Sequence, residues 1–147
     1  MKSWLLRRAE LADFDAVAAI RKQAMGGDYF KNTFDEERVN PHYYFTVLEL
    51  AGQLIGYAVV ELTPPDAVLC EVAVRPEWRR QGWASKMWKD VRQTARQRKV
   101  KRIFLELRES NVAALAWYKT LGFMEINRRQ SYYSDPQEDG IIMKLTV

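Results

Sequence analysis

The chain has 147 residues, 48% of them hydrophobic and 12% aromatic, which excludes a disordered or low-complexity protein and predicts a single packed domain over residues 1–147. Its formal net charge of +4 favours anionic partners such as nucleic acid, the ribosome surface or a phosphate-bearing cofactor, but charge alone does not choose among them. The one cysteine excludes an internal disulfide, and no Cys/His cluster has metal-ligand spacing, so we expect no metal. No apolar run has the length of a signal-peptide core or a membrane span. We therefore expect a cytoplasmic protein with no membrane partner.

In the first part of the chain, apolar periodicity predicts strands and amphipathic helices. The spacing of Phe14, Val17 and Arg21 is typical of one helix face, and Gly26 follows where that helix ends. Two strand-like runs are joined by Ala51-Gly52-Gln53, a short connection that suits an antiparallel hairpin. The predicted elements are strands at 4–8, 44–50, 54–62 and 67–74, a helix at 11–25 and a short helix near 33–38.

The second part of the chain predicts two helices and three strands. Met87, Trp88 and Val91 fall on one side of the first helix, as in a helix packed on a sheet. The basic stretch from Arg92 to Arg102 is interpreted as a solvated face, which argues against a nucleic-acid partner. Gly122 stands where left-handed backbone commonly ends a helix. The predicted elements are helices at 84–98 and 111–121 and strands at 102–107, 123–133 and 140–146, an α/β (α+β) arrangement.

The turn between the strand at 67–74 and the helix at 84–98 has the composition of an anion site. Arg79, Gly82 and Ala84 are spaced as Arg-x-x-Gly-x-Ala and lead directly into the helix. The first N–H groups of a helix lack intrahelical partners and carry partial positive charge, so they can receive a pyrophosphate. Glycine lets the backbone approach the anion closely. Taken alone, the pattern is more often an ordinary strand-to-helix loop, and only its context favours the anion site.

That context is a series of motifs that resembles the GNAT acetyltransferases, whose acetyl-CoA motif is Arg/Gln-x-x-Gly-x-Gly/Ala after a Val-Ala-Val-like strand. The motifs that carry the likeness are, in chain order, Val72-Ala73-Val74, Arg79 to Ala84, Leu105 to Asn111 and Ala116 to Phe123. The C-terminal part, with Tyr132-Tyr133 and Glu138 to Met143, is similar to the ribosomal-protein alanine N-acetyltransferases of the RimI type. The likeness is dense from Ala67 to Leu145 and general before it.

The resemblance implies a GNAT fold, a mixed and mostly antiparallel sheet of about six to seven strands with about four helices, splayed at the strand pair that holds acetyl-CoA. It also implies an acetyl-CoA-dependent N-acetyltransferase in which the amine attacks directly in a ternary complex. The acceptor that it implies is the α-amino group of a protein, in the RimI type a ribosomal protein. The implied cofactor-binding residues are Val72, Ala73, Val74, Arg79, Arg80, Gln81, Gly82, Trp83, Ala84, Ser85 and Asn111.

Glu106 stands at the end of the strand at 102–107, and by resemblance it is the general base, acting through water. An α-amino group has a pKa of about 8 against about 10.4 for lysine, so a weak base is sufficient for an N-terminal acceptor. An ion pair of Glu106 with Arg102 or Arg108 is the structural alternative, and it would not exclude catalysis. Glu71 is either a second carboxylate or a solvent-facing strand residue.

Tyr118 is the candidate general acid for the departing thiolate. Asn111, Ala114 and Tyr118 fall on one helix face, and Asn111 resembles the family asparagine that binds the pantetheine arm. The alternative for Tyr118 is a core tyrosine with a hydrogen-bonded hydroxyl. The backbone of Val72-Ala73-Val74 is expected to bind the pantetheine and to stabilise the thioester oxygen.

Tyr132 and Tyr133 are the candidate acceptor-binding residues, since tyrosine combines apolar area with a hydrogen-bonding hydroxyl. Strict strand alternation sends them to opposite faces, so both reach one groove only if a bulge intervenes. Trp83 and Gly140 depart from the family pattern, which more often has a smaller aliphatic residue and an alanine there. The segment 26–44 has no close match to the related enzymes, so the identity of the acceptor is the least constrained prediction.

Other functions stay open at this point. Within the same enzyme class, the acceptor could be a small-molecule amine or a lysine side chain. In a different class, the domain could bind acyl-CoA without catalysis, or it could be a basic nucleic-acid-binding module whose affinity falls steeply with salt.

Overall fold

The strands and helices form where apolar periodicity predicts them, with ends shifted by at most a few residues. The computed structural model describes residues 3–25, 33–134 and 136–147. The strands are β1 (Trp4–Arg8), β2 (Tyr43–Leu50), β3 (Gln53–Thr63), β4 (Asp66–Val74), β5 (Arg102–Arg108), β6 (Met124–Tyr133) and β7 (Glu138–Thr146). The helices are α1 (Phe14–Met25), α2 (Thr33–Val39), α3 (Trp83–Gln97) and α4 (Val112–Thr120), with short 3-10 turns η1 (Leu11–Asp13) and η2 (Pro76–Trp78).

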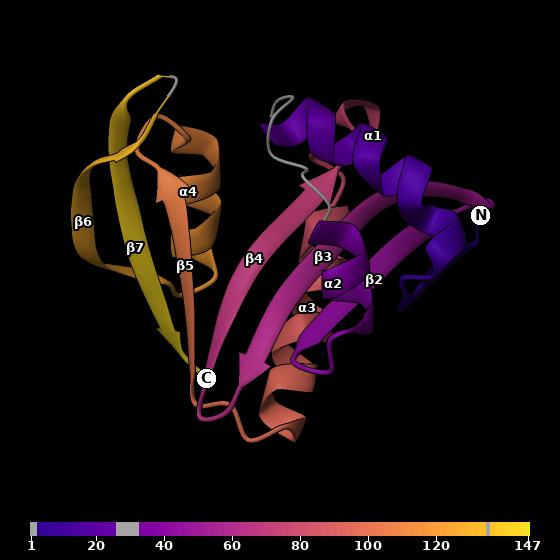
Figure 1. Ribbon diagram of the computed structural model, residues 1–147, viewed down its shortest axis with the longest axis horizontal. Coiled ribbons are helices and arrows are strands. Elements are labelled where there is room, and N and C mark those ends of the chain that lie inside the picture. Colours follow the sequence, from indigo (N-terminus) through magenta and orange to yellow (C-terminus); the bar gives the residue numbers. More distant parts are fainter. Residues whose placement is uncertain (1–2, 26–32, 135) are drawn as a thin grey trace.

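In the described residues, the strands form one sheet in the order β1-β2-β3-β4-β5-β7-β6. Neighbouring strands are antiparallel except β4 and β5, which are parallel. Parallel neighbours need a crossover connection, and α3 lies within the one that joins these strands (Figure 1). The mixed, mostly antiparallel sheet of the expected fold is therefore confirmed.

The parallel strands β4 and β5 separate along their length. Their pairing runs from Asp66 opposite Arg102 to Val68 opposite Phe104 and stops there, although both strands continue. Figure 1 shows the two strands diverging from this paired end. Beyond Val68, the edge of β4 that faces β5 has backbone N–H and C=O groups free of a strand ladder. The predicted splay is therefore present in the sheet.

A bulge in β4 changes which side chains face which side of the sheet. The pairing of β3 with β4 passes over Cys70. Before this residue, Ala67 and Leu69 face the core that includes α3. After it, Val74 faces that core and Ala73 faces the opposite one. One inserted residue reverses the alternation of a strand, so the two halves of β4 expose opposite sets of residues to each core.

Within the described residues, buried apolar side chains form two clusters, one on each side of the sheet. The larger contains Met87 and Val91 of α3 and is joined by side chains of α4. The other contains Val17 and Ile20 of α1 and Phe34 of α2. Because α1 contacts β3 and β4 while α2 contacts β2, the second side of β5, β7 and β6 is left without a helix among the described residues.

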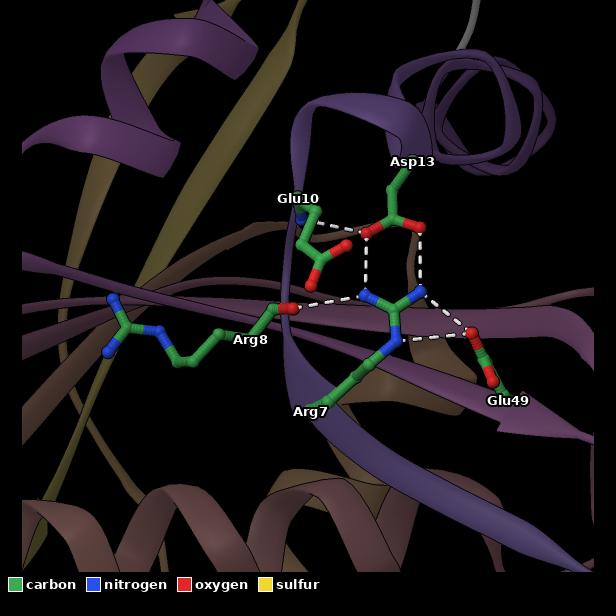
Figure 2. A network of polar contacts seen from close by, with 5 residues as sticks. All are labelled: Arg7, Arg8, Glu10, Asp13 and Glu49. Carbon is green, nitrogen blue, oxygen red and sulfur yellow. Dashed lines mark hydrogen bonds and ion pairs between the residues drawn. The ribbon is translucent and has the colours of Figure 1, made fainter.

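Arg7 ties β1 to the start of α1 and to β2 (Figure 2). Its terminal nitrogens donate to the two carboxylate oxygens of Asp13 at 2.8 Å each, and it also donates to Oε1 of Glu49 at 2.7 and 3.1 Å. The backbone N–H of Glu10 donates to the same carboxylate of Asp13 at 2.7 Å. These bonds from Arg7 hold the pKa of Asp13 below its ordinary value.

Arg21 forms a buried ionic cluster on the α1 side of the sheet. The side chain is 1% exposed; its Nε donates to Glu71 and its Nη2 to Glu37, each at 2.9 Å. Glu71 is therefore not the solvent-facing strand residue that alternation allowed, because the bulge at Cys70 turns it toward α1. The cluster fixes α1 and α2 on β4 beside the open part of the sheet.

Candidate active site

The turn before α3 has the geometry of an anion-binding site. Gly82 is the N-cap of α3 with φ of 87°, and Arg80 also has left-handed backbone with φ of 60°. The N–H groups at the start of α3 carry the partial positive charge of the helix and have no partner within the helix. A Cβ on Gly82 would meet no atom within 4 Å. The predicted turn is thus open where a pyrophosphate would be received.

Two side chains of the turn, those of Arg79 and Gln81, bind backbone carbonyls, whereas that of Arg80 is exposed to solvent. Nε of Arg79 donates to the carbonyl of Val74 at 2.9 Å, and the amide of Gln81 donates to the carbonyl of Glu77 at 3.2 Å. These bonds hold the turn against the end of β4. The exposed side chain of Arg80 is not part of these bonds and is available to an anion.

Trp83, one of the departures from the family pattern, packs back toward the start of the chain. Its ring lies edge-on to Trp4 at a centroid distance of 6.3 Å, and Nζ of Lys86 lies 4.8 Å from the centre of the Trp4 ring. The large side chain therefore has a packing partner in β1.

The strand segment Val72-Ala73-Val74 borders the splay. One edge of this segment pairs with β3, where Gly56 lies opposite Val74. A Cβ on Gly56 would lie 2.7 Å from the carbonyl oxygen of Ala73, so glycine is needed for this close approach. The other edge faces the diverging β5, and its backbone groups are the ones that a pantetheine arm could bind as an additional strand does.

A groove of about 550 Å³ opens on the side of the sheet away from α3, across the beginning of the splay. We call it the acceptor groove. Its lining residues come from β4, β5, β6 and β7 and are Val68, Leu69, Cys70, Phe104, Leu105, Glu106, Arg129, Tyr132, Tyr133 and Ile142. A predicted catalytic residue and both predicted acceptor-binding residues are thereby brought together, although β5 and β6 are not neighbours in the sheet.

Glu106 lies on the floor of the acceptor groove, on the opposite side of β5 from the buried Leu105 and Leu107. Its carboxylate Oε1 is 3.6 Å from Nη2 of Arg129, and its side chain is 34% exposed. The ion-pair partners considered from the sequence, Arg102 and Arg108, are paired with other carboxylates instead. Glu106 is thus open to an incoming amine and to the water that would relay a proton.

Tyr132 and Tyr133 both line the acceptor groove because the end of β6 is irregular. The register with β7 shifts between Arg129 and Tyr133, Ser131 has a φ of 52°, and its N–H donates to the carboxylate of Asp139 at 2.8 Å. The two rings meet edge-on at 5.0 Å. The bulge on which their shared orientation depends is present.

Gly140, the other departure from the family pattern, makes room for the tyrosines. A Cβ at this position would lie 3.0 Å from Cδ2 of Tyr132 and 3.3 Å from Cε2 of Tyr133. An alanine would therefore press on both rings. The glycine lets the tyrosine pair lie close over β7, which shapes this wall of the acceptor groove.

Tyr118 and Asn111 lie on α4, at the other side of the sheet. Oδ1 of Asn111 accepts the N–H of Ala114 at 3.3 Å, so this side chain caps the helix. The ring of Tyr118 packs edge-on against Phe123 at 5.7 Å, and burial raises the pKa of Tyr118 to about 12. Its hydroxyl therefore stays protonated at neutral pH, the state that a proton donor needs.

The two candidate proton-transfer residues lie on opposite sides of the sheet. Glu106 faces the acceptor groove, whereas Tyr118 belongs to the core on the α3 and α4 side. Between the two sides, the pairing of β4 with β5 ends at Val68 and Phe104. An amine could thus lose a proton on one side while a leaving group gains one on the other.

Arg129 is the residue of this site that sequence reasoning did not identify. Its guanidinium lies 3.6 Å from Glu106 and stacks 5.0 Å from the centre of the Tyr132 ring. The irregular register of β6 determines where this side chain falls. No periodicity in the sequence marks that irregularity, although the charge of Arg129 beside the tyrosine motif was a visible signal.

The described part of the chain meets the requirements of neither a metal site nor a membrane-spanning helix. Its side chains include no group of three or more His, Cys, Asp or Glu that could hold a metal ion. None of the helices described there is long and apolar enough to cross a membrane.

Comparisons with known proteins agree with the geometry. The model of the acetyltransferase (GNAT) family matches residues 9–123. A [ribosomal protein bS18]-alanine N-acetyltransferase of Escherichia coli K12 is 31% identical over 140 residues, 94% of each chain. The N-alpha-acetyltransferase RimI of Mycobacterium tuberculosis is 29% identical over 139 residues, 90% of this chain and 86% of that one. The crystal structure of the Escherichia coli ribosomal-protein-S18-alanine N-acetyltransferase superposes with a TM-score of 0.89 at 30% identity, covering 99% of this chain and 94% of that one.

Proposed function

Because the chain belongs to the GNAT acetyltransferase family, an acetyl-CoA-dependent group of N-acetyltransferases, we propose that its acceptor is the N-terminal α-amino group of a protein. The observation that carries the proposal is the acceptor groove, which Glu106 of β5 lines together with the pair Tyr132 and Tyr133 of β6, beside the start of the splay. A groove open at the surface admits the end of a peptide chain, and its tyrosines offer both ring surface and hydroxyl groups to the first peptide units.

The residues around the splay and the turn would hold acetyl-CoA. The pyrophosphate would lie on the N–H groups of Gln81 to Ser85 and near the side chain of Arg80. The backbone of Val72, Ala73 and Val74 would bind the pantetheine arm, with Asn111 at the start of α4 beside it. When bound, acetyl-CoA supplies an acetyl thioester, a carbonyl carbon activated toward amines.

In the proposed reaction, the amine attacks in a ternary complex of enzyme, acetyl-CoA and acceptor. The amine nitrogen bonds to the carbonyl carbon, and the carbon–sulfur bond breaks with its electron pair on sulfur. Glu106, through water, takes the proton that the nitrogen loses, and Tyr118 gives its proton to the thiolate. A proton passed from Glu106 back to Tyr118 through solvent restores both groups.

The α-amino group is the acceptor that this site is best equipped to use. The pKa of an α-amino group is about 8, whereas that of a lysine side chain is about 10.4, so a neutral α-amine is far more abundant at neutral pH. An exposed carboxylate such as Glu106 is a weak base, and it is sufficient only for an amine that is already easily deprotonated.

The relatives narrow the proposal to a ribosomal substrate. Those from Escherichia coli are named as alanine N-acetyltransferases of ribosomal protein bS18 or S18, and the resemblance covers 94% of this chain in sequence and 99% in structure. We therefore propose an alanine-started ribosomal protein as the physiological acceptor and the cytoplasm as the place of reaction.

The experiment that tests this proposal is an acceptor screen with the purified protein and acetyl-CoA. Short peptides with free N-termini, peptides in which only a lysine is free, and small amines are compared by thiol release and product mass. The proposal predicts the highest kcat/KM for peptides with an N-terminal alanine. Turnover confined to small amines or to lysine would keep the enzyme class and overturn the acceptor, and acetyl-CoA binding without turnover of any acceptor would contradict the proposal altogether.

A further inference from the structure

Arg129 reaches into the acceptor groove from the edge of the sheet. It lies on β6 opposite Gly140 of β7, while Glu106 lies on β5, beyond β7. Tyr132 packs close over Gly140, where any Cβ would come within 3.0 Å of its ring. The guanidinium of Arg129 stacks on that ring at 5.0 Å and faces Glu106 at 3.6 Å. The glycine and the tyrosine thus provide the surface that directs the arginine toward the carboxylate.

The charge in the acceptor groove is balanced by this pair. Of the described residues that line the groove, only Glu106 and Arg129 are charged. An acceptor amine has to come close to Glu106, and it then also approaches the cation of Arg129. Nearby like charges repel most effectively in a cleft that is partly shielded from water.

This repulsion does not act equally on all amines. At pH 8 about half of the molecules of an N-terminal peptide have a neutral α-amine, whereas nearly all lysine side chains are cationic. The neutral amine meets no repulsion from Arg129. A lysine side chain arrives as an ammonium group, and Arg129 already offsets part of the charge of the carboxylate that would attract it.

We infer that Arg129 is a specificity-determining residue that disfavours acceptors whose amine is cationic at neutral pH, lysine side chains in particular, and thereby favours α-amino acceptors. The inference rests on the proposed function, and it assigns the selection to one charge beside Glu106. The residue acts on the approach of the acceptor and takes no part in the proton transfers.

The test compares two acceptor peptides of the same sequence at pH 8. One has a free α-amine and an acetylated lysine, and the other has an acetylated N-terminus and a free lysine. Arg129→Gln is expected to raise the ratio of lysine to α-amine kcat/KM about two- to fivefold, the range of a partly exposed ion pair. The gain should shrink as salt is added, because screening weakens the attraction of the lysine to Glu106.

Arg128→Gln is the matched control, because Arg128 is the preceding residue and pairs with Glu125 and Glu109 outside the groove. It removes the same charge and should leave the ratio unchanged. Arg129→Lys keeps the charge and should stay near the wild-type ratio. If Arg129→Gln acetylates the α-amine but has a wild-type ratio, or no detectable lysine acetylation, the inference is overturned while the proposed function stands. A wild-type enzyme that acetylates no α-amine would instead remove the proposed function.

Discussion

Glu106 lines the acceptor groove and is also the proposed general base. Glu106→Gln keeps the size of the side chain and removes its ability to take a proton. We expect kcat to fall about a hundred- to ten-thousandfold, while the Kd for acetyl-CoA stays near that of the wild type. Glu109→Gln is the control, since Glu109 is also exposed but pairs with Arg128 outside the groove. Steady-state kinetics in which both variants match the wild type would remove Glu106 from the mechanism.

Tyr118 differs from Glu106 in that its role depends on a single hydroxyl group. Tyr118→Phe keeps the ring contact with Phe123 and should lower kcat about a hundred- to ten-thousandfold. Because the pKa of Tyr118 is about 12, its loss should change the height of the pH–rate profile near neutrality and not its shape. Tyr44→Phe also loses a hydrogen-bonded hydroxyl, the one that donates to Asp90 at 2.8 Å, and should leave kcat unchanged. Full activity in Tyr118→Phe would mean that the tyrosine is a core residue only.

The positions of only some of the proposed site residues could be predicted from the sequence. Glu106, Tyr118 and the turn residues stand in motifs whose spacing matches a known pattern, so their positions could be predicted. Glu71 and Arg129 could not, because a strand bulge decides where each side chain points. Neither bulge coincides with a glycine or proline, the residues that usually announce an irregular strand.

At the scale of elements, the turn into α3 has left-handed backbone at Gly82, and the space around this residue is open. Gly82→Ala places a Cβ on a residue with φ of 87°, which costs about 1–2 kcal/mol, and should also raise the Kd for acetyl-CoA because the backbone of the turn shifts. Gly52→Ala is the control, since Gly52 has a φ of 80° and equally open surroundings in the β2–β3 hairpin. Both variants should lose similar stability in urea, but only Gly82→Ala should bind acetyl-CoA more weakly. Equal affinities of the two variants for acetyl-CoA would show that the turn does not bind the cofactor.

The junction of β1, α1 and β2 predicts a pH dependence of stability. The pKa of Asp13 is lowered in the folded protein, mainly by hydrogen bonds from Arg7, so its contribution is present above the unfolded value of about 3.9. It is lost as the pH falls through the lowered folded pKa. Asp13→Asn should therefore reduce the free energy of unfolding at pH 7 by about 1–3 kcal/mol.

The measurement is urea unfolding of the wild type and of Asp13→Asn at pH 7 and at several values below pH 5. The difference between them should shrink as the pH falls. A difference that stays constant down to pH 2 would show that the carboxylate charge of Asp13 does not stabilise the junction shown in Figure 2.

The secondary structure was more predictable than the shape of the sheet. Strongly periodic segments such as β3 and α3 carry their own signal, whereas the divergence of β4 from β5 arises from tertiary packing on both sides. The splay was expected only through the resemblance to a family. On the α1 side of the sheet, α1 contacts β3 and β4 and α2 contacts β2.

At the scale of the whole molecule, the proposed cofactor and acceptor sites are supported by the two cores on either side of one sheet. The core with α3 and α4 carries the turn and Tyr118, and the open side of β5 and β7 carries the acceptor groove. The splay lies between β4, which belongs to both cores, and β5. The proposed reaction therefore depends on the sheet as a unit and on no single element.

The most direct measurement uses one peptide with a free N-terminal alanine and one internal lysine. The purified protein is incubated with this peptide and acetyl-CoA, and fragment masses locate the acetyl group. The account predicts acetylation of the α-amino group, with the lysine left free while α-amine acceptor remains. Acetyl on the lysine alone, or no acetylation of the peptide at all, would contradict it.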